Sequence, residues 1–230
     1  MSTRVLQGDP DIALTLRRSA RARRMTLRIS QIDGRVTLTL PTRASEREAL
    51  AFAETKQAWI RKHLEASVGQ VSVALGSRIP VAGALCEIVP GTGRRVLFED
   101  GVLYVPGTED RVPARVLGYL KTRARDRLAG ASDHYAALLG RSYSGISMRD
   151  TRSRWGSCSS AGRLMYSWRL IMAPPAVLDY VAAHEVAHLA QMNHSPAFWA
   201  EVERIYGPYA APRAWLRREG NDLHRFRFGD

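Results

Sequence analysis

The chain has little of what would supply a covalent framework or a membrane anchor. Only two of its 230 residues are cysteine, and Cys86 and Cys158 form no CxxC arrangement. Neither a disulfide scaffold nor a thiolate zinc site is therefore indicated. No stretch approaches the roughly 18 apolar residues of a membrane helix, and the first residues lack the apolar core of a secretory signal. The sequence predicts a soluble, cytoplasmic protein with no membrane partner.

The charge is strongly biased to one sign. The formal net charge is +12, and the excess comes from arginine rather than lysine. A hydrophobic content of 45% and a charged content of 24% lie in the globular range, which excludes a disordered chain. Attraction to an anionic partner stays open.

The first half of the sequence reads as mainly short strands. Residues 12–40 alternate apolar and polar residues and predict a hairpin with its turn at Asp33-Gly34. Ser45 is a plausible N-cap of one helix whose apolar stripe runs to Leu64. A glycine-punctuated, β-rich stretch then covers residues 71–106. We expect residues 1–108 to form a β-rich N-terminal region with one helix.

The second half reads as helical around two strands, which predicts an α+β fold with a second domain over residues 109–230. A basic amphipathic helix is expected over 111–139, and strands over 146–149 and 164–172. Pro174-Pro175 begin a helix to about Gln191, with Asn193 as a left-handed cap. Further helices are expected from Ser195 to Gly207 and over 212–219.

The residues that carry chemistry lie on the helix after Pro175. His184 and His188 are four residues apart, so their imidazoles lie one turn apart on one face and can bind one metal ion. Glu185 lies about 100° round the helix from His184, beside the metal rather than on it. That position suits a general base acting on a metal-bound water.

Hydrolytic zinc usually takes three protein ligands, and His194 is the nearest candidate for the third. The chain would have to turn back after Gln191 to bring that ring to the ion. The alternative is a chance arrangement of surface histidines, which would give HExxH in under about one chain in a hundred of this length. Metzincins share this spacing, but they have glycine where this chain has Gln191, and no Met-turn is evident.

Three motifs carry a resemblance to a known family: RWGSC at 154–158, HEVAH at 184–188 and NHSPAFW at 193–199. Together with upstream segments around residues 17–30 and 56–64, they resemble the YgjP-like metallopeptidases, predicted metal-dependent hydrolases related to SprT-like proteases. The resemblance implies a zincin-like catalytic domain with an HExxH active-site helix. It also implies a Zn²⁺ site on His184, His188 and His194, with Glu185 as the catalytic residue and peptides or proteins as substrates.

Two other functions stay open. One is a metal-dependent nucleoside triphosphate phosphohydrolase, and the other is a nucleic-acid-associated protease of the SprT-like kind. Both would use a basic cluster in which no acidic residue intervenes: Arg17, Arg18, Arg21, Arg23, Arg24 and Arg28. The simpler explanation is a solvated basic face, because the aromatic residues of a stacking platform are absent.

Substrate contacts can be assigned only as candidates. Residues 163–170 are a candidate edge strand to which an extended peptide could be added. An oxyanion would need a donor besides the metal, for which Arg154, Tyr166, Tyr206 and His224 are available. Cys158 adjoins the predicted site, but a lone cysteine is more often a small buried apolar residue.

Overall fold

A computed structural model describes residues 2–30, 34–65 and 69–229 of the chain. The fold consists of two compact units, Met1–Gln70 and Val71–Asp230. Both contain helices and sheets, so the mixed α+β architecture expected from the sequence is confirmed.

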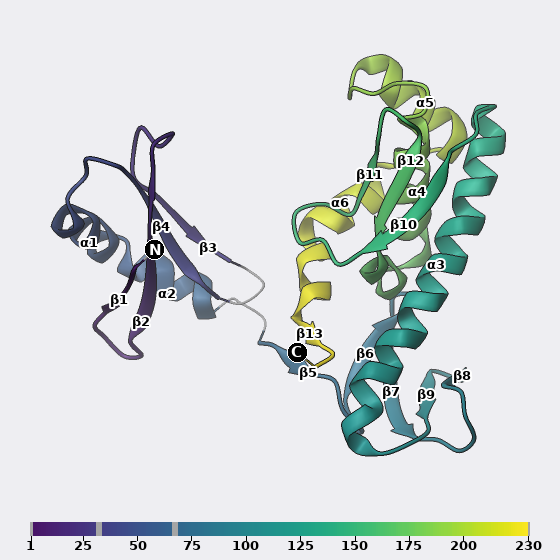
Figure 1. Cartoon of the computed structure of the whole chain (residues 1–230), viewed down its shortest axis with the longest axis horizontal. Coiled ribbons are helices and arrows are strands. Elements are labelled where there is room, and N and C mark those ends of the chain that lie inside the picture. Colours follow the sequence, from purple (N-terminus) through teal and green to yellow (C-terminus); the bar gives the residue numbers. More distant parts are fainter. Residues whose placement is uncertain (1, 31–33, 66–68, 230) are drawn as a thin grey trace. The chain divides into compact units, whose positions relative to one another are not determined.

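The first unit is a four-stranded sheet with two helices (Figure 1). Its strands are β1 (Ser2–Leu6), β2 (Ile12–Ser19), β3 (Thr26–Ile29) and β4 (Val36–Pro41), in the order β1-β2-β4-β3. Alternate residues of β2 and β4 are buried, as expected for a sheet with one covered face. The helices are α1 (Glu46–Thr55) and α2 (Gln57–Glu65), and their apolar residues complete a separate small core.

The hairpin expected over residues 12–40 is confirmed only in its second half. β3 pairs antiparallel with β4, whereas β2 runs parallel to β4. Asp33 of the predicted turn lies outside the described residues, and Gly34 has a positive φ of 66°. Ser45 caps α1 through a capping box with Glu48. The single helix predicted after Ser45 is wrong in one respect, because the helix is interrupted at Lys56.

The second unit contains the remaining strands and helices. A four-stranded sheet has the order β6-β7-β9-β8, built from β6 (Arg78–Val81), β7 (Ala84–Pro90), β8 (Leu97–Glu99) and β9 (Val102–Val105). The short strands β5 (Val71–Ser72) and β13 (Phe226–Arg227) pair with each other. The structure thus places residues 71–105 in the same unit and the same core as the helices that follow, whereas the sequence analysis grouped them with the N-terminal region.

The helix α3 (Val112–Leu139) runs along this unit (Figure 1). Beside its second half lies a three-stranded sheet of order β10-β12-β11, with β10 (Gly145–Arg149), β11 (Gly156–Cys158) and β12 (Arg163–Ser167). The continuous strand predicted over 164–172 is wrong beyond Ser167, because Trp168–Met172 form the 3₁₀ helix η2. Within η2, residue Arg169 is bound by Asp150 and by backbone carbonyls.

Three helices complete the unit: α4 (Pro175–Ala187), α5 (Pro196–Tyr206) and α6 (Ala210–Arg218). Gly83 fixes the start of α4, because a Cβ at this residue would lie 2.9 Å from the Cα of Pro174. α4 is buried on nearly all sides and so carries no amphipathic stripe. It is followed by α5, whose N-cap is Ser195 as predicted. The 3₁₀ helix η3 (Gly220–Arg225) leads to β13.

None of the helices in the described part of the chain is both long and apolar enough to cross a membrane.

Candidate metal centre

Three histidines converge where α4 ends and α5 begins. His184 lies in the last turn of α4, His188 is its C-cap, and His194 lies in the connection to α5. One ligand nitrogen from each of the three residues lies within 4.8 Å of the others. The structure therefore brings together the three side chains that the sequence analysis selected, in an arrangement that could hold a metal ion.

The connection that carries His194 turns back without a left-handed residue. α4 ends at Ala187 rather than near Gln191, and Asn193 has no positive φ, so both parts of the predicted helix end are wrong. Instead, the imidazole of His188 contacts the carbonyl oxygen of Gln191 through Nδ1, at 2.9 Å. The side chain of Asn193 accepts a hydrogen bond from the amide of Ser195. Because Gln191 has no positive φ, no glycine is needed at residue 191.

The positions of the ring nitrogens fit a metal ion. The Nε2 atoms of His184 and His194 lie 3.1 Å apart. Two nitrogens bound tetrahedrally at about 2.0–2.1 Å would lie about 3.3 Å apart. Contact of His188 Nδ1 with a carbonyl leaves its Nε2 for the ion, which is the usual role of such a second contact.

The surroundings of His184 and His188 favour the neutral form of each ring, which is the form that binds metal. Burial, the neighbouring His188 and His194, and the charge of Arg213 lower the pKa of His184 to about 3. Burial also lowers the pKa of His188, although its contact with Gln191 acts in the opposite direction. The ring of Phe198 packs on all three imidazoles and is fully buried, so it forms an apolar floor beneath them.

Glu185 is buried beside the three-residue strand β11. Its side chain is 5% exposed, and burial raises its pKa to about 8, while the charge of Arg154 acts in the opposite direction. Gly156 of β11 packs directly on this carboxyl group. A Cβ at residue 156 would lie 2.5 Å from Oε1 of Glu185 and 2.6 Å from its Cγ. The glycine of the RWGSC motif is thus needed for the close approach of strand and glutamate.

The open edge of the sheet near the site is β11, not residues 163–170. β12 pairs with β10 on one side and with β11 on the other, so it has no free edge. The prediction of a substrate-binding edge over residues 163–170 is therefore wrong. Backbone hydrogen bonds from Ser167 to Trp155 and from Ser159 to Arg163 direct residues 155, 157 and 159 toward β12. By the alternation of an antiparallel ladder, the N–H and C=O groups of Gly156 and Cys158 face the open edge.

Of the four candidate oxyanion donors, three are engaged elsewhere. The hydroxyl of Tyr166 is fully buried and hydrogen-bonded to Ser132, and the hydroxyl of Tyr206 donates to the carbonyl of Ala176. His224 is 3% exposed and packs against Trp155. Arg154 is exposed, and it is the residue whose charge acts on Glu185.

Aromatic rings lie on one side of the histidines and carry an arginine, Arg213, that the sequence analysis did not select. The ring of Trp199 lies 5.7 Å from the rings of both His184 and His194, and it stacks on Tyr209. The guanidinium of Arg213, on α6, lies over the Trp199 ring, 4.3 Å from its centre. The sequence signal for Arg213 is the segment Ala210–Arg218, which carries three arginines and no acidic residue.

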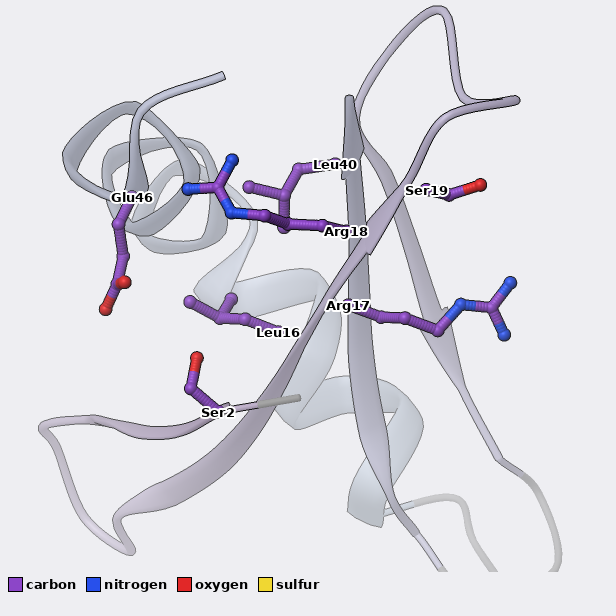
Figure 2. A pocket seen from close by; sticks show the side chains of 7 residues that line it. All are labelled: Ser2, Leu16, Arg17, Arg18, Ser19, Leu40 and Glu46. Atoms are coloured by element: carbon purple, nitrogen blue, oxygen red, sulfur yellow. The ribbon is translucent and has the colours of Figure 1, made fainter. Parts of the chain in front are cut away.

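The basic cluster of the first unit is divided between two sides of its sheet. Arg18 donates hydrogen bonds to the carbonyls of Thr42 and Ala44 at the start of α1, so it has a structural role. Figure 2 shows Arg18 directed toward α1 and Arg17 toward the opposite side of β2, around a pocket of about 640 Å³. Strand alternation and register place Arg28 on the same open face as Arg17.

Cys158 is half-buried on β11 and is not among the clustered metal-ligand atoms of the described residues. Burial and the nearby Glu185 raise the pKa of its thiol. The thiol is therefore not activated as a nucleophile.

Three histidines that could hold a metal ion therefore lie close to Glu185, a buried glutamate of α4. The sequence profile of the YgjP-like metallopeptidase domain matches residues 23–219. The chain belongs to this family, as the sequence motifs indicated. It is therefore a metallopeptidase by family, which implies a bound metal ion and peptide or protein substrates.

Two further comparisons add little. Among solved structures, the chain is similar to the metallopeptidase zymogen of Pyrococcus abyssi abylysin, with 22% sequence identity and a TM-score of 0.36. That similarity covers 40% of this chain and 92% of the other. No curated protein matches the chain.

Proposed function

We propose that the protein is a zinc-dependent peptidase in which His184, His188 and His194 hold the metal and Glu185 is the general base. One observation carries this proposal. One ligand nitrogen from each of the three histidines lies within 4.8 Å of the others. Glu185 follows His184 directly in the sequence, and its carboxyl group packs against the edge strand β11.

Each residue has a distinct task. A bound zinc ion would polarise the scissile carbonyl and acidify water. The carboxylate of Glu185 would accept a proton from the attacking water as the oxygen–carbon bond forms, and would deliver it to the leaving nitrogen as the carbon–nitrogen bond breaks. Burial of Glu185 supports this role, because it keeps bulk water away from the carboxyl group. Arg154 is the residue best placed to stabilise negative charge next to Glu185.

The substrate would bind as an added strand on β11. The outward backbone groups of Gly156 and Cys158 could pair with an extended peptide, which places its main chain beside Glu185. Replacing one substrate amide at a time by its N-methyl form tests this arrangement. We expect kcat/KM to fall at alternate positions of the substrate and not at every position, because only alternate amides face β11.

The central test compares wild-type protein with Glu185→Gln. Both should retain one zinc ion per chain, because Glu185 is not a ligand. Hydrolysis of an unfolded protein should fall by about 10²–10⁴-fold in the variant, which is the usual contribution of a general base. Glu99→Gln is the matched control, since Glu99 is an exposed glutamate of the same unit.

Absence of stoichiometric zinc from the wild type would refute the metal site. Glu185-dependent cleavage of nucleoside triphosphates alone would replace peptidase by phosphohydrolase.

The open sheet face of the first unit favours a second role, recruitment to nucleic acid. Arg17 and Arg28 are exposed there, with Thr37 and Thr39 of β4 between them in the register. Arginines and hydroxyl groups of this kind contact phosphates. Binding to single- and double-stranded DNA should weaken with salt, and the double change of Arg17 and Arg28 to Gln should reduce the salt dependence. Unchanged binding in that variant would remove this role.

A further inference from the structure

A basic pocket lies beside the metal centre. It has a volume of about 750 Å³ and lies where α5 turns into α6. Its wall includes Tyr209, Arg213, Arg217 and Arg218, and one acidic residue, Glu203 of α5. α6, which supplies the arginines, packs on α4, the helix that carries His184.

Trp199 connects the pocket with the histidines. Its ring centre lies 5.7 Å from those of His184 and His194 on one side, and 4.3 Å from the guanidinium carbon of Arg213 on the other. Arg213 is therefore within about 10 Å of both rings, the length of about three residues of extended chain. A peptide whose scissile bond lies at the metal could therefore place a side chain about three residues away beside Arg213.

Two of the arginines, Arg213 and Arg217, have no acidic partner in the described part of the chain. Arg218 is paired with Glu219, at 3.0 Å. Within residues 2–30, 34–65 and 69–229, no carboxylate lies within ion-pair distance of Arg213 or Arg217. Glu203 lines the pocket, but none of the ion pairs between described residues joins it to either arginine. Arg213 is also half-buried against Trp199, which removes part of its hydration and strengthens its attraction to an anion.

We propose that Arg213 and Arg217 form a specificity subsite that binds a carboxylate of the substrate about three residues from the scissile bond. The carboxylate would belong to an acidic side chain or to the end of the peptide. The planar guanidinium of Arg213, already fixed by Trp199, can donate two parallel hydrogen bonds to such a group. This subsite rests on the proposed peptidase function and names the kind of peptide that the enzyme prefers.

The test uses full-length, zinc-loaded protein and two series of quenched fluorescent peptides. In one series a single glutamate, and in the other a glutamine, is moved along the peptide from three residues before to three residues after the cleaved bond. We expect the wild type to prefer glutamate at one position by about tenfold to a hundredfold in kcat/KM, the usual effect of a hydrogen bond to a charged group. Arg213→Gln should lower the glutamate-to-glutamine ratio of kcat/KM to about one, and Arg213→Lys should keep part of the preference for glutamate.

Arg123→Gln is the matched control. Arg123 also lies over aromatic rings, Phe98 and Tyr119, but on α3 and outside the pocket. The Arg123→Gln enzyme should show the same glutamate-to-glutamine ratio of kcat/KM as the wild type. An Arg213→Gln enzyme that keeps the wild-type ratio would overturn the subsite while leaving the peptidase function in place.

A second measurement separates the subsite from catalysis. Calorimetric binding of the same peptides to Glu185→Gln, with and without Arg213→Gln, needs no turnover. If the glutamate peptide binds more tightly through Arg213 but no peptide is cleaved by the wild type, the subsite stands and the peptidase proposal falls. If a phosphoserine peptide binds through Arg213 while glutamate and glutamine peptides bind equally, the carboxylate assignment is wrong.

Discussion

Replacing Gly156 by alanine tests the contact between the edge strand and the candidate base. The added Cβ would lie 2.5 Å from Oε1, 2.6 Å from Cγ and 2.8 Å from Cδ of Glu185. Ordinary contact begins near 3.4 Å, so the strand or the carboxyl group must move by nearly 1 Å. A displacement of this size at a catalytic group can cost about 10²-fold in rate. We therefore expect kcat/KM to fall about 100-fold with the zinc content unchanged.

The same substitution should also affect stability. Forcing a methyl group into a packed site usually costs about 1–3 kcal/mol. For a unit of this size, that would lower the melting temperature by roughly 2–12 °C. Gly130→Ala on α3 is the control, because its Cβ would meet nothing within 4 Å. Metal analysis, peptide hydrolysis and thermal unfolding of both variants decide the matter. Wild-type kcat/KM in Gly156→Ala would refute the proposed contact.

Three other predictions concern stability. Ser45→Ala should remove the capping box of α1 and cost the first unit about 1 kcal/mol in urea unfolding, whereas an unchanged midpoint would show that the cap contributes nothing. Asp150→Asn should cost the second unit about 1.5–3 kcal/mol, because it leaves the charge of Arg169 buried without its carboxylate; equal unfolding free energies would contradict this. Burial lowers the pKa of His224 to about 4 in the folded protein, whereas in the unfolded chain this imidazole is protonated below about pH 6.5. Stability should then be complete above pH 6.5 and fall toward pH 4 by up to about 1.4 kcal/mol per unit, with a shallower slope in His224→Gln.

Local signals in the sequence predicted the ends of several elements. Ser45 and Ser195 cap helices as expected, because a cap depends on a residue and its neighbours three positions away. The long helix α3 also lies where its period placed it. Asn193 shows the limit of such signals, since a side chain that tolerates a left-handed conformation accepts a hydrogen bond from Ser195 instead.

Sheet order could not be predicted from the pattern of single strands. Residues 163–167 alternate as an edge strand would, yet they form the central strand β12, and the short segment Gly156–Cys158 forms the edge. Likewise, residues 71–105 form short strands as the first unit does, but their buried residues share a core with those of α3. Which strand pairs with which depends on contacts between residues far apart in the chain, which a local period does not encode.

The sequence by itself predicted two of the three candidate ligands, because a helix of 3.6 residues per turn places His184 and His188 on one face and Glu185 beside them. The tertiary structure decided what surrounds these residues. It brought His194 back through the bond between His188 and the Gln191 carbonyl, and it buried Glu185 beneath the glycine of β11. The physical reason is that spacing along a helix is a local property, whereas burial, an open sheet edge and an unpaired charge arise only when distant segments pack together.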